Sequence, residues 1–183
     1  KRLPKNLIAL VGSLTVGLSF VIALWNFVAM LATPELPLIR NYFTWIEAGR
    51  FQSQFGFMLD HLSGLMILIV TGVGFLIHVY SAGYMEHEEG FYRYFAYLNL
   101  FVFFMLMLVL ADNYLLLYLG WEGVGLCSYL LIGFWYERRS SSSAAKKAFI
   151  TTRVGDAAML LGIVLIFLHV GSLDFGVVFG PGA

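Results

Sequence analysis

The stretch Tyr114–Trp135 reads YLLLYLGWEGVGLCSYLLIGFW, and its one ionisable carboxyl group, on Glu122, stands in an otherwise apolar run. An α-helix needs about 20 predominantly apolar residues to cross the hydrocarbon core of a bilayer. This stretch therefore predicts a membrane-spanning helix with a charge near its middle. A charged side chain at that depth costs about 2.5–3.5 kcal/mol on insertion scales, so Glu122 is a candidate functional residue.

Four further segments have the length and composition of spanning helices, at residues 7–32, 57–80, 91–110 and 144–170. The chain of 183 residues is 60% hydrophobic and 12% charged, whereas soluble domains carry about 25% charged residues. We therefore predict an all-α integral membrane protein with about five transmembrane helices in one membrane unit, residues 1–183. Because the chain begins with Lys1 rather than methionine, we expect it to be a fragment of a longer protein.

The connection between the first two spans is the only long one, and it has a different pattern. Aromatic residues alternate with glutamine and glycine over residues 51–57, and Ala48-Gly49 can turn the chain just before them. Alternation with a period of two is typical of β-strands. We therefore predict a short β-hairpin on the membrane surface over residues 42–57.

The basic residues of the loops predict the orientation, because cytoplasmic loops of membrane proteins carry an excess of lysine and arginine. One side of the membrane has the N-terminal residues and two of the loops, and its basic residues are Lys1, Arg2, Lys5, Arg93, Arg138, Arg139, Lys146 and Lys147. The other side has only Arg40 and Arg50. The side richer in basic residues is predicted to face the cytoplasm, or the matrix or stroma in an organelle, and the hairpin and the short turn at residues 111–113 are predicted to lie outside.

Two more charges lie at membrane depth, in the last span. Arg153 and Asp156 are three residues apart, so they share one helical face and can neutralise each other as a structural ion pair. Lys147 lies nearer the interface, where its chain can reach the polar headgroups and anchor the helix. Asp60 begins the second span, where a helix N-cap is the favoured interpretation.

Glu122 has no basic residue three or four positions away on its own helix. It therefore needs a partner from another helix, a water-filled cavity or a proton. A buried carboxyl group that balances these alternatives can change protonation, which is what a transport relay requires. The glycines at 120, 123 and 125 lack the strand context of a nucleotide site, and we expect them to let another helix approach Glu122.

The remaining features argue against several classes of function. The formal net charge of +0 gives no reason to expect nucleic acid as a partner. The one cysteine, Cys127, excludes a disulfide framework and a cysteine-based metal site by count. His78 and His169 lie near predicted helix ends and are interpreted as interfacial. Neither catalytic residues, a metal site nor a cofactor is predicted.

The segment Leu119–Trp135 closely resembles chain 5, or the L subunit, of proton-pumping NADH:quinone oxidoreductase, respiratory complex I. Similar segments run in the same order on both sides, at Thr71–His78, Arg93–Phe101, Lys147–Phe149 and Arg153–Asp156. The resemblance covers about residues 57–168. It implies an antiporter-like inverted-repeat subunit, of which residues 1–56 match only the general layout.

The resemblance also implies roles for individual residues. In this family a glutamate of the Trp-Glu-Gly motif joins a chain of buried charges and pairs with a lysine of a later helix, which is expected outside these 183 residues. Carried over, Glu122 is that glutamate, Arg153 and Asp156 lie near the ion pathway, and Asp60 matches an earlier Leu-Asp. Lys147, in a matching segment, completes the predicted proton-translocation set. Thr152 and His61 depart from the family pattern, which leaves the local hydrogen bonding open.

The resemblance implies a membrane-arm subunit that takes part in proton translocation, with electron transfer in partner chains and protons, lipid and other membrane-arm subunits as its partners. The expected location is the bacterial inner membrane, with the mitochondrial inner and thylakoid membranes as alternatives. The competing hypotheses are a subunit of a cation/proton antiporter without redox coupling and a structural scaffold with inert charges.

Overall fold

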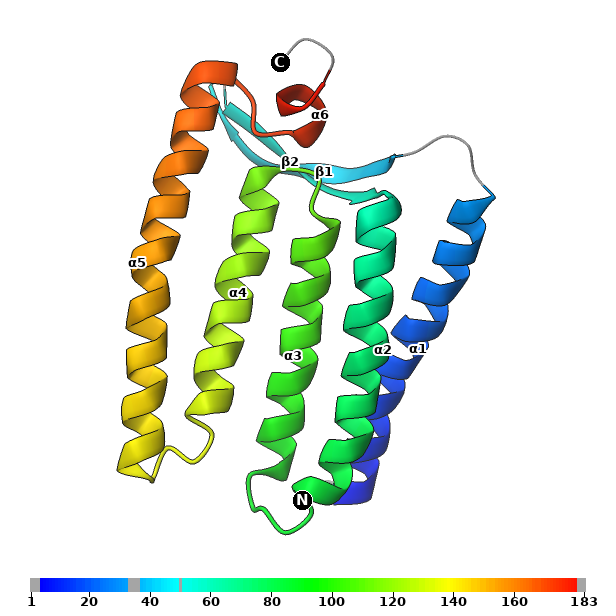
Figure 1. Ribbon diagram of the computed structural model, residues 1–183, viewed down its shortest axis with the longest axis vertical. Helices are drawn as coiled ribbons and strands as arrows, with labels where there is room; N and C mark the ends of the chain where they lie inside the picture. The colour runs from blue at the N-terminus through cyan, green and yellow to red at the C-terminus, as the bar shows by residue number, and fades with distance from the viewer. Residues whose placement is uncertain (1–3, 33–36, 50, 181–183) are drawn as a thin grey trace.

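The computed structural model describes residues 4–32, 37–49 and 51–180. Its long helices are α1 (Lys5–Leu31), α2 (His61–Tyr84), α3 (Phe91–Leu110), α4 (Tyr114–Ile132) and α5 (Arg139–Val170). All five are long and apolar enough to cross a membrane. They stand side by side, with α1 packed on α2 and α3 (Figure 1). The chain is therefore an all-α membrane bundle, as predicted.

A two-stranded antiparallel hairpin connects α1 to α2, formed by β1 (Leu38–Ala48) and β2 (Phe51–Leu59). It lies across one end of the bundle, next to the short helix α6 (Phe175–Val178) (Figure 1). Gly49 adopts a φ of 62° after β1, a left-handed conformation that glycine tolerates without steric cost. The predicted hairpin is thus present, and it is longer than the 42–57 expected.

Four of the five helices differ from their expected bounds, α1 by only one or two residues at each end. The segment predicted as a helix from residue 57 pairs as β2 up to Leu59, so α2 begins at His61 and ends at Tyr84. The helix predicted at 114–135 ends at Ile132, before Gly133. The helix predicted at 144–170 begins at Arg139, because the serines expected in a loop form its first turn. Serine is only moderately unfavourable in a helix, and the alanines that follow favour one.

Side-chain caps fix where two helices begin. Asp60 accepts a hydrogen bond from the Ser63 backbone N–H at 2.7 Å, and the Ser63 hydroxyl accepts one from the Asp60 N–H at 2.8 Å. Asn113 caps α4 through Leu116 N–H at 2.9 Å and donates to the Gln54 carbonyl oxygen of β2 at 2.9 Å. The side-chain oxygens of Asp60 and Asn113 satisfy helix N–H groups that have no intrahelical partner. The bond from Asn113 to Gln54 also attaches the hairpin to the start of α4.

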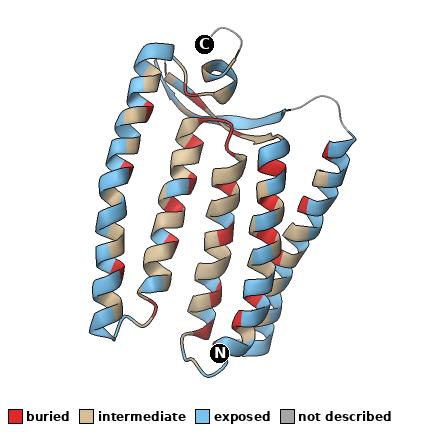
Figure 2. Cartoon of the chain, in the orientation of Figure 1, coloured by how far each residue is buried: buried red, intermediate tan, exposed pale blue. Residues whose placement is uncertain are grey.

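The pattern of exposed and buried side chains is the one expected of a helix bundle in a membrane. Buried residues lie along the faces between helices, whereas the outer faces are exposed and apolar (Figure 2). Two clusters of buried hydrophobic side chains pack the two ends of the bundle. Met85, Phe91, Phe95 and Phe134 pack at the end away from the hairpin, and Met107, Ala111 and Leu116 pack below it. The exposed apolar faces suit contact with lipid chains or with further transmembrane helices.

Small residues bring α3 and α4 together. A Cβ atom at Gly120 would lie 2.7 Å from the backbone N and Cα of Leu108, and one at Gly123 would overlap the Phe104 ring. The expectation that these glycines let a helix approach the backbone is confirmed. We predict that Gly120→Ala destabilises the full-length protein by about 1–3 kcal/mol, because the backbone of α3 must shift.

Thermal unfolding in detergent micelles measures this loss. Gly162→Ala on α5 is the matched control, because apart from its chain neighbours and the backbone of its own helix no described atom lies within 4 Å of its Cβ position, and alanine is the better helix former by about 1 kcal/mol. Equal stability of the two variants would contradict the close packing of α3 on α4.

Asp112, in the turn between α3 and α4, is buried against Gly56 of β2 and the Asn41 side chain of β1. Burial raises the pKa of this carboxyl group above its ordinary value of 3.8, and the nearby charge of Asp174 adds to the effect. The hydrogen bond from Asn113 Nδ2 at 2.6 Å opposes it. The native protein therefore holds this proton more tightly than the unfolded chain does.

Since the native pKa of Asp112 is raised, its contribution to stability falls as pH rises from 3.8 through the native pKa. We expect Asp112→Asn to keep the acceptor for Asn113, to remove this slope and to be at least as stable as the unmodified protein at pH 8. Thermal unfolding at several pH values checks this. Glu47→Gln, an exposed change on β1, is the control, and an undiminished slope in Asp112→Asn would contradict the assignment.

Candidate functional site

A cluster of three charged side chains joins α4 to α5 halfway across the bundle. The Arg153 guanidinium contacts the Glu122 carboxylate directly, and its Nη1 lies 3.3 Å from Asp156 Oδ2. Eight positions separate Glu122 from the start of α4, which is about 12 Å at the α-helical rise. Arg153 also lies near the middle of its helix, Arg139–Val170. The three groups therefore share one depth, well inside the membrane.

The surroundings of Arg153 hold it between its two partners. A Cβ atom at Gly125 would lie 2.8 Å from Arg153 Nη2, so glycine at this position leaves room for the guanidinium. The guanidinium also covers the Phe149 ring, 4.3 Å from its centroid. A cation placed over an aromatic face gains about 0.5–2 kcal/mol, more when desolvated. The space at Gly125 and the Phe149 ring thus orient the Arg153 guanidinium toward both carboxylates.

Asp156 is the most enclosed member of the cluster, since its side chain is 6% exposed, compared with 28% for Glu122 and Arg153. Trp121 Nε1 donates a hydrogen bond to Asp156 Oδ1 at 2.7 Å. Both carboxylate oxygens of Asp156 therefore have a donor, one from α4 and one from α5. Glu122 has Arg153 as its charged partner.

The cluster has one negative charge in excess when all three groups are ionised. Isolated charge is costly in a low-dielectric environment, and one guanidinium neutralises only one of the two carboxylates. The arrangement therefore contains one carboxyl group more than a neutral ion pair requires.

The structure brings together three of the five predicted site residues. Asp60 lies at the hairpin end of α2 as its N-cap. Lys147 is exposed on α5, six positions before Arg153 and thus on a different side of the helix. The roles of these two in proton translocation stay predictions. Lys1, Arg2 and Arg50, used for the orientation, lie outside the described residues.

Sequence reasoning missed two features of the polar interior. It did not identify Trp121 as a donor to Asp156, although the position of Trp121 directly before Glu122 in the Trp-Glu-Gly motif could have indicated that its indole N–H lies near the charged groups. It was also wrong about His78, which is 1% exposed rather than interfacial, because α2 continues to Tyr84. His78 Nδ1 lies 2.7 Å from the Gly74 carbonyl oxygen, and no described group bonds its Nε2.

Two family models match the chain. Residues 45–95 match the N-terminus of chain 5 of NADH-ubiquinone oxidoreductase (complex I). Residues 111–179, which contain the whole charged cluster, match the transmembrane model of NADH:quinone oxidoreductase and Mrp antiporters.

Curated relatives agree with these models. NADH-quinone oxidoreductase subunit L of Escherichia coli K12 is 48% identical over 174 residues, which cover 95% of this chain and 28% of the relative. The protein of the same name from Mycobacterium tuberculosis H37Rv is 54% identical over 145 residues, 79% of this chain and 23% of the relative. The chain thus spans about a quarter of the length of the curated relatives it matches.

A solved structure with the same fold is the Mrp complex from Dietzia sp. DQ12-45-1b, with a TM-score of 0.79 and 25% identity. The alignment covers 92% of this chain and 18% of that one. The arrangement of five spans and a surface hairpin is therefore shared with an Mrp assembly.

Proposed function

Because this chain belongs to the antiporter-like membrane subunits typified by subunit L (chain 5) of NADH:quinone oxidoreductase, we propose that it takes part in proton translocation within the membrane arm of that enzyme. Over the described residues it has five helices that are long and apolar enough to cross a membrane, and its bacterial relatives support a location in the bacterial inner membrane. Redox chemistry would take place in partner subunits, since no cofactor-binding motif is found in the sequence.

The observation that carries this proposal is the ion cluster shared by α4 and α5. Glu122, Arg153 and Asp156 have one carboxylate more than they have cations, at a depth where an unpaired charge is costly. A structural ion pair needs only one acid for one base. The additional carboxylate gives the cluster a group that can gain and lose a proton.

The geometry supports a specific sequence of events. When a proton binds the Glu122 carboxylate, the attraction between Glu122 and Arg153 falls, and Arg153 shifts toward Asp156 on its own helix. When the proton leaves Glu122, Arg153 returns to bridge both helices. Trp121 keeps Asp156 in place throughout, because its Nε1–H bond does not depend on the charge of Glu122.

Asp60 and Lys147 are the two further residues that we propose to take part in proton translocation. Asp60 lies on the hairpin side and Lys147 on the opposite half of α5, so they flank the cluster along the membrane normal. The lysine that the family pairs with this glutamate would come from a later helix. We propose that protons, lipid and neighbouring membrane-arm subunits are the partners of this chain.

The second candidate function is a subunit of a cation/proton antiporter without redox coupling, which the Mrp likeness favours. The two functions differ in what drives the proton. Deleting the gene should abolish NADH-driven acidification of inverted membrane vesicles and leave sodium-dependent proton flux unchanged. Loss of sodium-dependent flux with intact NADH-driven pumping would establish the antiporter instead.

A further inference from the structure

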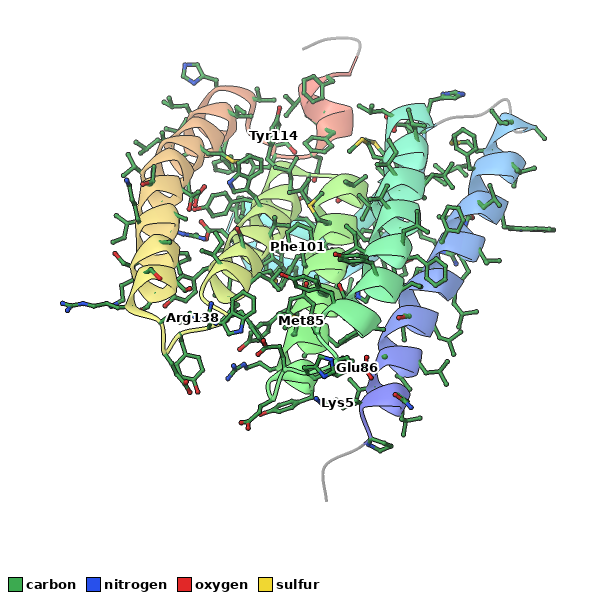
Figure 3. The ribbon with its side chains drawn as sticks, turned by 60° about the horizontal axis from the view of Figure 1, so that its bottom comes forward. Lys5, Met85, Glu86, Phe101, Tyr114 and Arg138 are labelled. Carbon is green, nitrogen blue, oxygen red and sulfur yellow. The ribbon has the colours of Figure 1, made fainter. Side chains whose placement is uncertain are left out.

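A polar cavity of about 320 Å³ opens at the end of the bundle away from the hairpin. It lies between the loop that joins α2 to α3 and the segment that joins α4 to α5, on the side predicted to be cytoplasmic. Figure 3, which brings this end forward, labels Arg138 and Glu86 there. Its volume is in the range of about 300–1,000 Å³ that small-ligand sites occupy.

Two arginines line this cavity, and aromatic rings orient both. The Arg93 guanidinium lies 5.1 Å from the ring centroid of Phe134 and 4.9 Å from that of Tyr136. The Arg138 guanidinium lies 5.2 Å from the Trp135 ring. Over residues 4–32, 37–49 and 51–180 the only ion pairs are those of Arg153. Two cations thus face one cavity without a carboxylate partner, which is an arrangement that suits a phosphate group.

Three carboxylates line the same cavity, those of Glu88, Glu89 and Glu137, with His87 beside them. Glu88 Oε2 accepts a hydrogen bond from Trp135 Nε1 at 3.2 Å, which fixes one of them. Because carboxylates outnumber guanidinium groups, a purely anionic ligand would be repelled in part. A ligand with both a phosphate and a cation matches both sets.

From these charges we infer that the cavity binds the headgroup of a zwitterionic phospholipid with a primary amine, phosphatidylethanolamine. The phosphate pairs with Arg93 and Arg138, and the ammonium donates hydrogen bonds to the carboxylates. A quaternary choline group has no N–H and cannot make those bonds. Trp135 and Tyr136 are residues that favour the membrane–water interface, and exposed Ile132 on α4 offers apolar surface to the acyl chains.

The test uses the full-length protein in its detergent-purified parent complex, stripped of lipid and exposed to equimolar dioleoyl phosphatidylethanolamine, phosphatidylcholine and phosphatidylglycerol. Mass spectrometry counts the lipid retained. We expect phosphatidylethanolamine to be preferred, and Arg93→Gln/Arg138→Gln to lower its apparent affinity by about tenfold or more, since each charge-assisted bond is strong. Glu89→Gln/Glu137→Gln should weaken the preference for phosphatidylethanolamine over phosphatidylglycerol.

The matched controls are Arg139→Gln and Glu86→Gln, which change the same kinds of charge beside the cavity without lining it. Unchanged phosphatidylethanolamine retention in the double arginine variant would overturn the inference, and so would equal retention of phosphatidylglycerol by the unmodified protein. Full displacement by soluble phosphoethanolamine would identify a free metabolite as the occupant rather than a lipid. If the arginine variant fails to assemble, as a native gel would show, the glutamate variant decides by its lipid preference.

Discussion

Replacing Arg153 by Gln is expected to lower the free energy of unfolding of the full-length protein by about 3 kcal/mol, because it leaves two carboxylates inside the membrane without a cation. The contact with the Phe149 ring is lost as well. Thermal unfolding in nanodiscs measures the loss.

A second substitution distinguishes the loss of the ion cluster from the loss of side-chain packing as the cause of the lower stability. Adding Glu122→Gln to Arg153→Gln removes one of the unpaired carboxylates, so it should recover a large part of the lost stability. Lys147→Gln is the control on the same helix, because Lys147 is exposed and has no ion-pair partner among the described residues. Strictly additive losses in the double variant would contradict a shared ion cluster.

Replacing Glu122 by Gln is expected to reduce proton translocation through this chain by more than about tenfold, because an amide cannot take up or release a proton. Assembly should be preserved, since Arg153 keeps Asp156 as a partner at 3.3 Å and the remaining pair is neutral. The initial rate of NADH-driven acidification in inverted vesicles, normalised to the amount of assembled complex, measures the effect.

Two variants make this prediction specific. Glu122→Asp keeps an ionisable carboxyl group on a shorter side chain, so it should retain more activity than Glu122→Gln. Glu86→Gln makes the same chemical change in the loop after α2 and should leave the rate unchanged. A Glu122→Gln variant that pumps at the unmodified rate would favour the structural scaffold.

Much of the architecture could be predicted from the sequence, because apolar length fixes a spanning helix. The helix at Phe91–Leu110 has the predicted bounds, since charged and polar residues flank it on both sides. The start of α2 could not be predicted from hydropathy. The last residues of β2, Phe57, Met58 and Leu59, are as apolar as those of a helix, and only their pairing with β1 identifies them as part of a strand.

The candidate site was predicted in part. Arg153 and Asp156 form the expected ion pair because three residues along a helix always place two side chains on one face. The contact of Arg153 with Glu122 could not be inferred in the same way, because it depends on how α4 and α5 are rotated against each other. That rotation depends on tertiary contacts such as the space above Gly125 and the bond from Trp121 to Asp156.

His78 illustrates how a helix boundary changes the interpretation of a residue. A span ending near residue 80 would place this histidine at the interface. The observed helix continues to Tyr84, so the imidazole lies inside the bundle, with its ring centroid 6.0 Å from that of Phe95. An error of four residues in the end of the helix was thus enough to assign this polar group to the membrane surface instead of the interior.

The central claim is that Glu122 exchanges a proton within the cluster that it forms with Arg153 and Asp156. The most direct test is the number of protons translocated per NADH oxidised, measured in inverted vesicles that contain the assembled Glu122→Gln complex. The account predicts a lower ratio than in the unmodified complex, with Glu86→Gln unchanged. An unchanged ratio in Glu122→Gln would contradict it.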